Sequence, residues 1–395
     1  MRQVLVVYGT RPEAIKMAPL VAALDRSSHC QPIVAVTGQH RDMLDQVNRL
    51  FAIEPGFDLN IITAGQSLEQ ITARVLEGVS DIISALRPDA VVVQGDTSTC
   101  FAASLASAYN RIPLVHLEAG LRTGDRDNPH PEEINRRMTS VLASLHLAPT
   151  HISKANLLKE GIPEDDIVVT GNTVIDALLH VSSRPGPYGC AELENLSGRR
   201  FVLVTAHRRE SWGEPMARAA RAIATLARLF PGTVFVLPAH LNPAVQAVLL
   251  PPLRDLPNVL ITRPMDYFDF TKAMRDCTLV LTDSGGVQEE APTFGKPVLV
   301  MRDTTERPEA VAAGTVRLVG TDENRIVTEV TELLTDDLAH ERMAQAINPY
   351  GDGRAAMRAV QAIEHFFGVG IRPDEFAIAS RSNADSDIIA EGTAA

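Results

Sequence analysis

The 395-residue sequence lacks the features that mark disulfide-rich, zinc-binding and nucleic-acid-binding proteins. Its four cysteines, Cys30, Cys100, Cys190 and Cys277, are scattered, and none forms a C-x-x-C pair. This pattern is typical of reduced thiols in a cytoplasmic protein and argues against a disulfide framework or a zinc site. The 37 Lys and Arg against 49 Asp and Glu give a formal net charge of −12, without basic runs. Nucleic acid and anionic membrane surfaces are therefore not expected as partners.

Long apolar runs and the common nucleotide motifs are also missing. No stretch approaches the ~20 apolar residues that a membrane helix needs. The apolar start, MRQVLVVYGTRPEA, flows into a structural motif and is expected to be a first strand rather than a signal peptide. There is no G-x-G-x-x-G and no G-x-x-x-x-G-K-[ST] segment. A Rossmann dinucleotide site and a P-loop NTPase are therefore not indicated, and no cofactor is predicted.

Short runs rich in Val, Leu and Ile alternate with longer amphipathic segments. In the first half these runs are VLVVYG, PIVAVTG, DAVVVQGD, IPLVHLE, LHLAP and DIVVTG. In the second half they are RFVLVTAH, TVFVLPAH, NVLIT, TLVLTDSGG and KPVLVM. Continuous apolar strands separated by helices indicate parallel sheets covered on both faces. We predict an α/β protein with two doubly wound, Rossmann-like domains facing each other across a cleft.

The composition also suggests where these domains begin and end. We expect a first domain over residues 1–175, and a Pro-, Gly- and Ser-containing linker over 176–200. A second domain is expected over 201–348, followed by a C-terminal helix over 349–370 that packs back toward the first domain. Residues 371–395 are small, polar and acidic, so the sequence predicts a disordered tail.

Charged residues of the first half fall just after predicted strands, which is where open parallel sheets bind ligands. Arg11 and Lys16 follow the first strand and could clamp an anion. Asp96 follows a later strand and could also be a helix N-cap. Glu118 ends an apolar strand, where a buried carboxylate needs a partner. Glu132 opens a helix, where an acid also favours the helix dipole.

The stretch VLTDSGGVQEEAPTFGKPVLVMRDTTERPEA carries the clearest ligand signal in the second half. Ser284, Gly285 and Gly286 are predicted to open a helix whose free backbone N–H groups bind phosphate. Glu290 could accept both hydroxyls of a ribose, and Arg307 could add charge-assisted hydrogen bonds to an anion. The ligand that this combination implies is a nucleoside diphosphate.

Two histidines, His207 and His240, also follow strands of the second half. A lone histidine is more often a packed residue than a metal ligand. Because no recognised metal-ligand spacing occurs, no metal site is predicted.

Taken together, these segments resemble the non-hydrolysing UDP-N-acetylglucosamine 2-epimerases, which have the two-domain fold of GT-B glycosyltransferases. The resemblance runs from about Val4 to Gly368. It rests on ten blocks in the family's order: GTRPEAIKMAPL, GQHRDMLDQV, QGDTST, HLEAGLRTGD, PHPEEINR, VTGNTVIDAL, TAHRRESWGEP, PAHLNP, LTDSGGVQEEAPTFGKPVLVMRDTTERPEA and NPYGDG. What it implies is reversible C2 epimerisation of UDP-N-acetylglucosamine to UDP-N-acetylmannosamine in a homodimeric enzyme.

The resemblance also implies a role for each matching position. Arg11, Lys16 and His207 would face the diphosphate and sugar, and Ser284, Gly285, Gly286, Glu290 and Arg307 would hold the nucleotide. Met265 and Phe270 would form the uracil pocket, and Asp96, Glu118, Glu132 and His207 would be the catalytic set. Gln39, Gln66 and His240 match a second, regulatory site. Asp42 and Gly65 depart from that site's pattern, which weakens the expectation of allosteric activation.

The chemistry of the implied reaction accounts for several acids in one site. The sugar C2 proton is not next to a carbonyl carbon, so direct abstraction would give an unstabilised carbanion. Elimination of UDP to a 2-acetamidoglucal, followed by re-addition, avoids this and needs acid–base groups near both faces of C2. Three alternatives stay open from the sequence: a hydrolysing epimerase that releases N-acetylmannosamine and UDP, a GT-B glycosyltransferase, and a nucleotide-sugar sensor without turnover.

Overall fold

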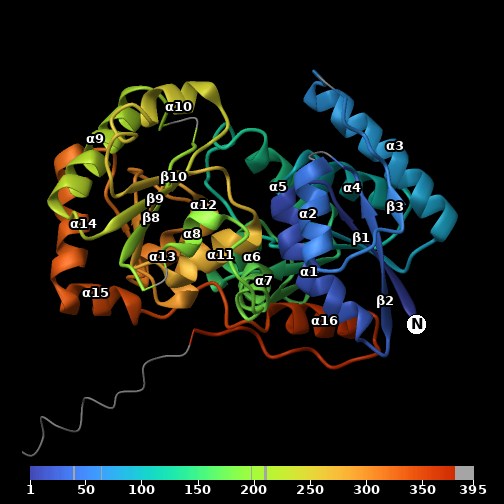
Figure 1. Cartoon of the computed structure of the whole chain (residues 1–395). Helices are drawn as coiled ribbons and strands as arrows, with labels where there is room; N and C mark the ends of the chain where they lie inside the picture. The colour runs from blue at the N-terminus through green and yellow to red at the C-terminus, as the bar shows by residue number, and fades with distance from the viewer. Residues whose placement is uncertain (39–40, 64, 197, 209–210, 379–395) are drawn as a thin grey trace, which may run out of the picture.

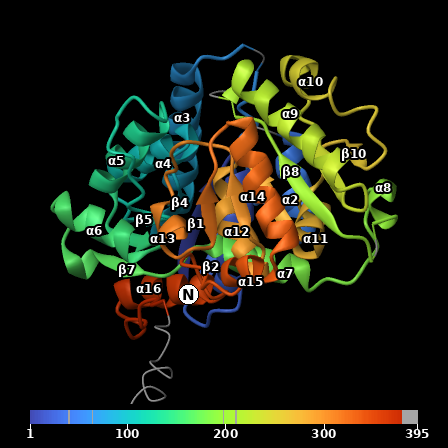
Figure 2. The same cartoon turned by 90° about the vertical axis from the view of Figure 1, so that its left-hand side faces the viewer.

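The chain forms two parallel β-sheets, each covered by helices on both faces (Figures 1 and 2). The structure is a computed structural model that describes residues 1–38, 41–63, 65–196, 198–208 and 211–378. The predicted α/β class with two doubly wound sheets is confirmed. No helix within the described ranges is long and apolar enough to cross a membrane.

The first sheet has seven strands in the order β3-β2-β1-β4-β5-β6-β7, all parallel. The strands are β1 (Arg2–Tyr8), β2 (Cys30–Val36), β3 (Phe57–Asp58), β4 (Ala90–Gln94), β5 (Leu114–Leu117), β6 (Leu145–Ala148) and β7 (Ile167–Val169). Its helices are α1 (Arg11–Asp25), α2 (Arg41–Leu50), α3 (Leu68–Leu86), α4 (Ser98–Tyr109), α5 (Glu132–Leu142) and α6 (His151–Lys159), with a 3₁₀ turn at Glu164–Asp166. The strand β3 was not predicted from the sequence, because a two-residue strand at the edge of a sheet is too short to contain an apolar run.

Alternation along β1 shows how the two faces are filled. Val4 and Val6 belong to a buried cluster that includes residues of α1 and α2. Leu5 and Val7 belong to a separate buried cluster with residues of α3 and α4. Successive side chains of a strand point to opposite faces, so a continuous apolar run is what a doubly covered strand requires.

The second sheet has six parallel strands in the order β10-β9-β8-β11-β12-β13. The strands are β8 (Phe201–Thr205), β9 (Val234–Pro238), β10 (Val259–Thr262), β11 (Leu279–Thr282), β12 (Val298–Val300) and β13 (Val316–Leu318). Its helices are α9 (Glu214–Leu229), α10 (Pro243–Leu249), α11 (Tyr267–Asp276), α12 (Gly285–Glu290), α13 (Pro308–Ala312), α14 (Glu323–Thr335) and α15 (Asp337–Ala344), with a 3₁₀ turn at Ala291–Phe294. The sequence missed β13, a three-residue edge strand with Arg317 at its centre.

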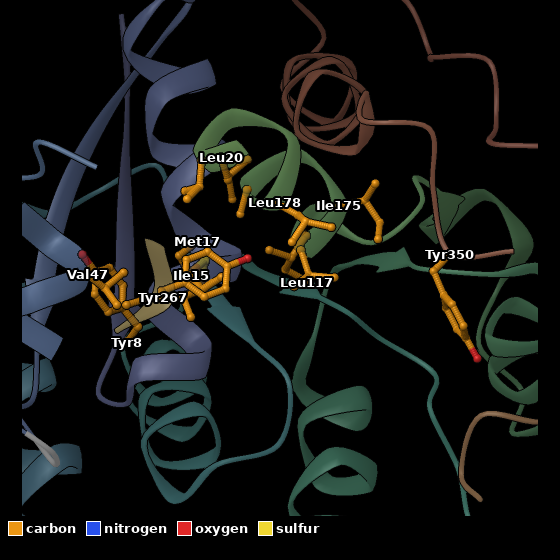
Figure 3. Packing of buried hydrophobic residues seen from close by; sticks show 14 of the residues in the cluster. Tyr8, Ile15, Met17, Leu20, Val47, Leu117, Ile175, Leu178, Tyr267 and Tyr350 are labelled. Carbon is orange, nitrogen blue, oxygen red and sulfur yellow. The ribbon is translucent and has the colours of Figure 1, made fainter. Parts of the chain in front are cut away.

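One buried cluster joins the two halves. It includes residues of α1 and of the connecting helix α7 (Thr173–Ser182), together with Tyr267 of α11 and Tyr350 (Figure 3). The C-terminal helix α16 (Ala355–Phe366) contacts α1 and α7 and lies beneath the first sheet (Figures 1 and 2). A short helix, α8 (Ala191–Glu194), lies in the stretch that the sequence predicted to be a linker.

The segment 371–378 differs from the disordered tail that the sequence predicted. Its Phe376 is buried, and the backbone N–H of Phe376 donates to the Val169 carbonyl at 2.8 Å. The Arg372 guanidinium donates to the carbonyls of Asp165 and Ile167 at 2.8 and 2.6 Å. The prediction is therefore wrong for 371–378, because Phe376, Arg372 and the pairing of Glu375 with Lys154 dock the segment beside β7. The rest of the predicted tail, 379–395, lies outside the described residues.

Gly120 sets the path of the loop that follows β5 and carries Glu118. It has a φ of +88°, and a Cβ there would lie 2.2 Å from the Ser153 carbonyl oxygen. Gly124 also has a positive φ, +80°, but a Cβ there would meet nothing within 4 Å. We expect Gly124→Ala to cost about 1–2 kcal/mol for the left-handed backbone alone. Gly120→Ala is expected to cost at least about 2 kcal/mol more, because the α6 backbone must move.

Urea unfolding of the two variants checks this expectation. Equal losses would show that the approach of Gly120 to Ser153 does not constrain the loop.

Candidate active site

A cavity of about 640 Å³ lies between the carboxyl ends of the two sheets. The first half contributes the start of α1 with Met43, α7 contributes Val174, and the second half contributes the segments after β8, β9, β10, β11 and β12. The sequence-predicted residues in its wall are Arg11, Lys16, His207, His240, Met265, Phe270, Ser284, Gly286, Glu290 and Arg307. Asp96, Glu118 and Glu132 are not in this wall. The cavity thus combines the predicted cations with the predicted nucleotide segment, and of the predicted acids Glu118 contacts a wall residue, Lys16.

The first turns of α1 bring Arg11 and Lys16 to the cavity. Thr10 is the N-cap of α1, and its hydroxyl accepts from the backbone N–H of Glu13 in a capping box. The buried Glu13 carboxylate accepts hydrogen bonds from the backbone N–H groups of Gly9 and Thr10, and from the Thr97 hydroxyl at 2.6 Å. The hydrogen bond from Thr97 to Glu13 ties the start of α1, which carries Arg11, to the loop that follows β4.

Glu118 is the first residue after β5, and its carboxylate is fully paired. It accepts from the Lys16 ammonium, from the Gln94 amide and, at 2.9 Å, from the Asn172 amide. Burial alone would raise the pKa of the Glu118 carboxyl, but the Lys16 charge and hydrogen bond outweigh burial and lower it. Glu118 also has a φ of +63°, a conformation that residues with side chains rarely adopt. Such strain is concentrated at functional sites.

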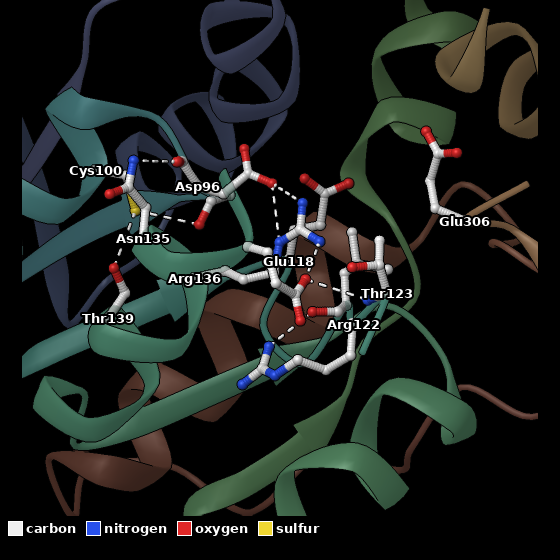
Figure 4. Close-up of polar contacts among 12 residues, drawn as sticks. Asp96, Cys100, Glu118, Arg122, Thr123, Asn135, Arg136, Thr139 and Glu306 are labelled. Atoms are coloured by element: carbon white, nitrogen blue, oxygen red, sulfur yellow. Dashed lines mark hydrogen bonds and ion pairs between the residues drawn. The ribbon is translucent and has the colours of Figure 1, made fainter. Parts of the chain in front are cut away.

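Asp96 is held by an arginine rather than by a helix end. The N-cap of α4 is Thr97, so the alternative role of Asp96 as a cap is wrong. The Asp96 carboxylate instead accepts two bonds from the Arg136 guanidinium (Figure 4). Arg136 also pairs with the buried Glu133 at 2.8 Å. The neighbouring Glu132 begins α5, and its Oε2 is buried without a hydrogen-bond partner.

His207 lines the cavity from the second half of the chain and pairs with the buried Asp283. The Asp283 carboxylate accepts from the backbone N–H groups of His207 and Arg208 at 2.7 and 2.8 Å. Its other oxygen lies 3.0 Å from Nδ1 of His207. The ring of His240 stacks on that of His207, with centroids 6.3 Å apart. Asp283 thereby fixes the ring of His207, which lines the cavity.

Arg307 is the centre of a buried ionic cluster beside the turn at Ser284. Its guanidinium lies 2.7 Å from the Glu289 carboxylate and 2.9 Å from the Glu306 carboxylate. A Cβ on Gly285 would lie 3.2 Å from Cζ of Arg307 and 3.0 Å from Glu306. A side chain at 285 would therefore press on the ends of the side chains in this cluster, which would have to shift to make room.

Glu290 lies at the end of α12 and lines the cavity with Tyr267. Burial, together with the nearby Glu289 charge, raises the pKa of the Glu290 carboxyl from 4.5 to about 8. Both Glu290 Oε2 and the Tyr267 hydroxyl are buried without a hydrogen-bond partner. Two polar groups in that state are suited to receiving a ligand's hydroxyls.

The raised pKa of Glu290 makes stability fall as pH rises. Between pH 4.5 and about 8 the folded protein keeps a proton that the unfolded chain releases, so each pH step favours unfolding. Glu290→Gln removes this term. We expect the stability of the wild type relative to Glu290→Gln to decline by about 1–3 kcal/mol from pH 5 to pH 8. Urea unfolding of both proteins at several pH values measures this difference, and parallel curves would contradict it.

The predicted regulatory site stays a prediction, because only Gln66 and His240 of its three residues lie in the described part of the chain. Gln66 binds its own loop, accepting from the Thr63 N–H at 2.7 Å and donating to the Ile61 carbonyl at 2.9 Å. His240 lines the cavity. Gln39 lies outside the described residues.

Several residues that matter to the site were not found from the sequence. Asp283, Glu289, Asn172 and Arg136 all hold a predicted residue by a direct contact. Asp283 and Glu289 stand beside predicted residues in the chain, which was a usable signal. Nothing in the sequence joins Asn172 to Glu118 or Arg136 to Asp96, because these partners meet only through the sheet order.

Comparisons with known proteins agree on one family. A family model described as UDP-N-acetylglucosamine 2-epimerase matches residues 22–364. A Salmonella typhimurium protein of that name is 51% identical over 371 residues, covering 92% of this chain and 99% of the relative. A putative UDP-N-acetylglucosamine 2-epimerase structure from Listeria monocytogenes has a TM-score of 0.89 at 46% identity, covering 95% of this chain and 99% of its own. The Neisseria meningitidis enzyme, solved bound to UDP-GlcNAc, has a TM-score of 0.84 at 46% identity, covering 92% and 100%.

Proposed function

Because the chain belongs to the UDP-N-acetylglucosamine 2-epimerase family, we propose that it interconverts UDP-N-acetylglucosamine and UDP-N-acetylmannosamine by elimination and re-addition of UDP. The observation that carries the proposal is the cavity lined by Lys16 on one side and by Glu290 with Arg307 on the other, with Glu118 paired to Lys16 behind the wall. It pairs a cationic grip for a leaving diphosphate with a carboxylate at the end of β5.

The cations that would hold the leaving diphosphate come from both halves of the chain. Arg11 and Lys16 lie in the first turns of α1, and Arg307 lies in the loop after β12. The charges of Glu118 and Glu289 outweigh burial and raise the pKa of the Lys16 ammonium, so it stays protonated. Fixed cations aimed at the β-phosphate stabilise the charge that develops as the C1–O bond breaks.

In the forward step a carboxylate takes the C2 proton while the C1–O bond breaks, which leaves a C1=C2 double bond and free UDP in the cavity. In the return step the UDP oxygen attacks C1 and a proton reaches the opposite face of C2. Asp96, Glu118 and Glu132 are the proposed acid–base set, with His207 held near the diphosphate by Asp283. The contact of Glu118 with the Lys16 ammonium favours its ionised, proton-accepting form. Asp96 is held in place by the Arg136 guanidinium.

The remaining cavity residues would hold the nucleotide. Glu290 and the Tyr267 hydroxyl offer unpaired oxygens for the ribose, and Met265 with Phe270 offers apolar surface for the base. Ser284 and Gly286 line the cavity where the diphosphate would meet backbone N–H groups.

The proposal is tested by incubating the enzyme with UDP-N-acetylglucosamine in deuterated water. We expect deuterium at C2 of both epimers and no net accumulation of free UDP. Accumulation of UDP and N-acetylmannosamine would establish the hydrolysing reaction instead. Tight binding of UDP-N-acetylglucosamine without deuterium incorporation would refute the epimerase and leave a sensor or a transferase.

A further inference from the structure

Asn172 bridges two carboxylates, one from a segment that follows a strand of the first sheet and one from a segment that follows a strand of the second. It lies between β7 and α7 and is buried. One amide group, Nδ2, donates to Oε1 of Glu118 at 2.9 Å and to Oε2 of Glu289 at 3.1 Å. Glu118 follows β5 in the first sheet, and Glu289 lies on α12 after β11 in the second.

Helix capping explains only half of this side chain. Asn172 is the N-cap of α7, and its Oδ1 accepts from the Val174 N–H at 3.1 Å. Its backbone N–H donates to the Tyr350 carbonyl at 2.7 Å. A serine could make the same cap through its hydroxyl oxygen. Neither role uses the two amide hydrogens, and both of those go to carboxylates.

The bridge reaches the cavity at both ends. On one side Glu118 binds the Lys16 ammonium, and Lys16 lines the cavity. On the other side Glu289 accepts from Nε of Arg307 at 2.7 Å, and Arg307 lines the cavity from the second sheet. Glu118 and Glu289 are both buried, so neither carboxylate can turn away without leaving charge or an amide hydrogen unpaired.

We propose that Asn172 and Glu289 are positioning residues, which fix the Glu118 carboxylate relative to the Arg307 guanidinium. Nucleotide binding at Arg307 and proton transfer at Glu118 are then coupled through one buried chain of hydrogen bonds. This inference rests on the proposed function and deepens it. A diphosphate on Arg307 competes with Glu289 for the guanidinium. Any shift of Glu289 is then passed by the shared amide to Glu118, in the other sheet.

The Asn172 donor also favours the ionised form of Glu118, because a hydrogen bond to a carboxylate opposes its protonation. Removing the donor should therefore make Glu118 protonate at higher pH. A misplaced carboxylate lowers the rate of proton transfer far more than it lowers nucleotide affinity.

Asn172→Ser tests the bridge, because serine keeps the cap and loses the two-donor amide. In the full chain we expect kcat for C2 deuterium incorporation to fall about 10- to 100-fold, with KM for UDP-N-acetylglucosamine changed less than about threefold. The acid limb of the kcat/KM profile should move to higher pH. Glu289→Gln should lower kcat as well, and the double variant should lose less than the product of the two single losses.

Asn258→Ser is the matched control. Asn258 is also buried, and its amide donates to the carbonyls of Ala227, Phe230 and Thr233 at 2.9, 3.1 and 2.9 Å, away from the cavity. It should lower the Tm and leave kcat and the pH profile unchanged.

If the wild type is active and Asn172→Ser changes only the Tm or KM, this inference is overturned and the proposed function stands. A wild type without C2 exchange would overturn it together with the proposed function.

Discussion

Glu118→Gln is expected to lower kcat for epimerisation by about 10³-fold or more, while UDP still binds within a few-fold of the wild-type affinity. An amide cannot take or return the C2 proton, and removal of a general base typically costs 10²–10⁴-fold. UDP affinity should persist, because the cations and Glu290 that line the cavity are unchanged. Single-turnover deuterium incorporation and calorimetric UDP titration measure the two effects separately.

Glu309→Gln controls for the loss of a buried carboxylate. Glu309 is buried and accepts from the hydroxyls of Thr150 and Tyr350 at 2.9 and 3.3 Å, outside the cavity wall. It should lose stability and keep kcat. If Glu118→Gln retained more than a tenth of the wild-type kcat, Glu118 would not be an acid–base group of the reaction.

Arg307→Gln is expected to weaken UDP binding at least about 100-fold and to lower the free energy of unfolding by about 3–5 kcal/mol. Charge-assisted hydrogen bonds are worth about 1.5–3 kcal/mol each, and two of them to a diphosphate account for the lost affinity. The stability falls because Glu289 stays buried without its guanidinium partner. Calorimetry and urea unfolding give the two quantities.

A double variant separates these two roles of Arg307. Adding Glu289→Gln to Arg307→Gln removes the uncompensated charge, so most of the stability should return while UDP binding stays weak. Arg317→Gln is the control, because Arg317 pairs with Glu329 and Glu332 at the protein surface. It should cost no more than about 1 kcal/mol and leave UDP affinity unchanged. Full recovery of UDP binding in the double variant would show that Arg307 acts only through the fold.

The sheets were predictable because their central strands are buried on both faces. Continuous apolar runs such as VLVVYG and DAVVVQGD are typical of strands that are buried on both faces, and they form β1 and β4. The edge strands β3 and β13 were not predictable, since they pair on one side only and are two and three residues long. Docking of residues 371–378 was missed because composition does not show where Phe376 finds a hydrophobic neighbour.

The site residues that lie at the ends of strands could be predicted from the sequence. The side-chain contacts between distant segments that hold these residues could not. The carboxyl ends of parallel strands share one edge, so Arg11 and Ser284 could be expected to face a cleft before their neighbours were known. The Asn172 contact with Glu289 spans 117 positions in the chain. It depends on how the two sheets meet, which no local pattern encodes. The homodimer implied by the resemblance stays a prediction.

The central claim is that the bond between C1 and the UDP oxygen breaks and re-forms during epimerisation. It is tested most directly with UDP-N-acetylglucosamine that carries ¹⁸O in the bridge between C1 and the β-phosphorus. Free rotation of the β-phosphate of released UDP should scramble the label into non-bridging positions, at a rate comparable to deuterium incorporation at C2. Epimerisation with all of the ¹⁸O still in the bridge would contradict the elimination mechanism.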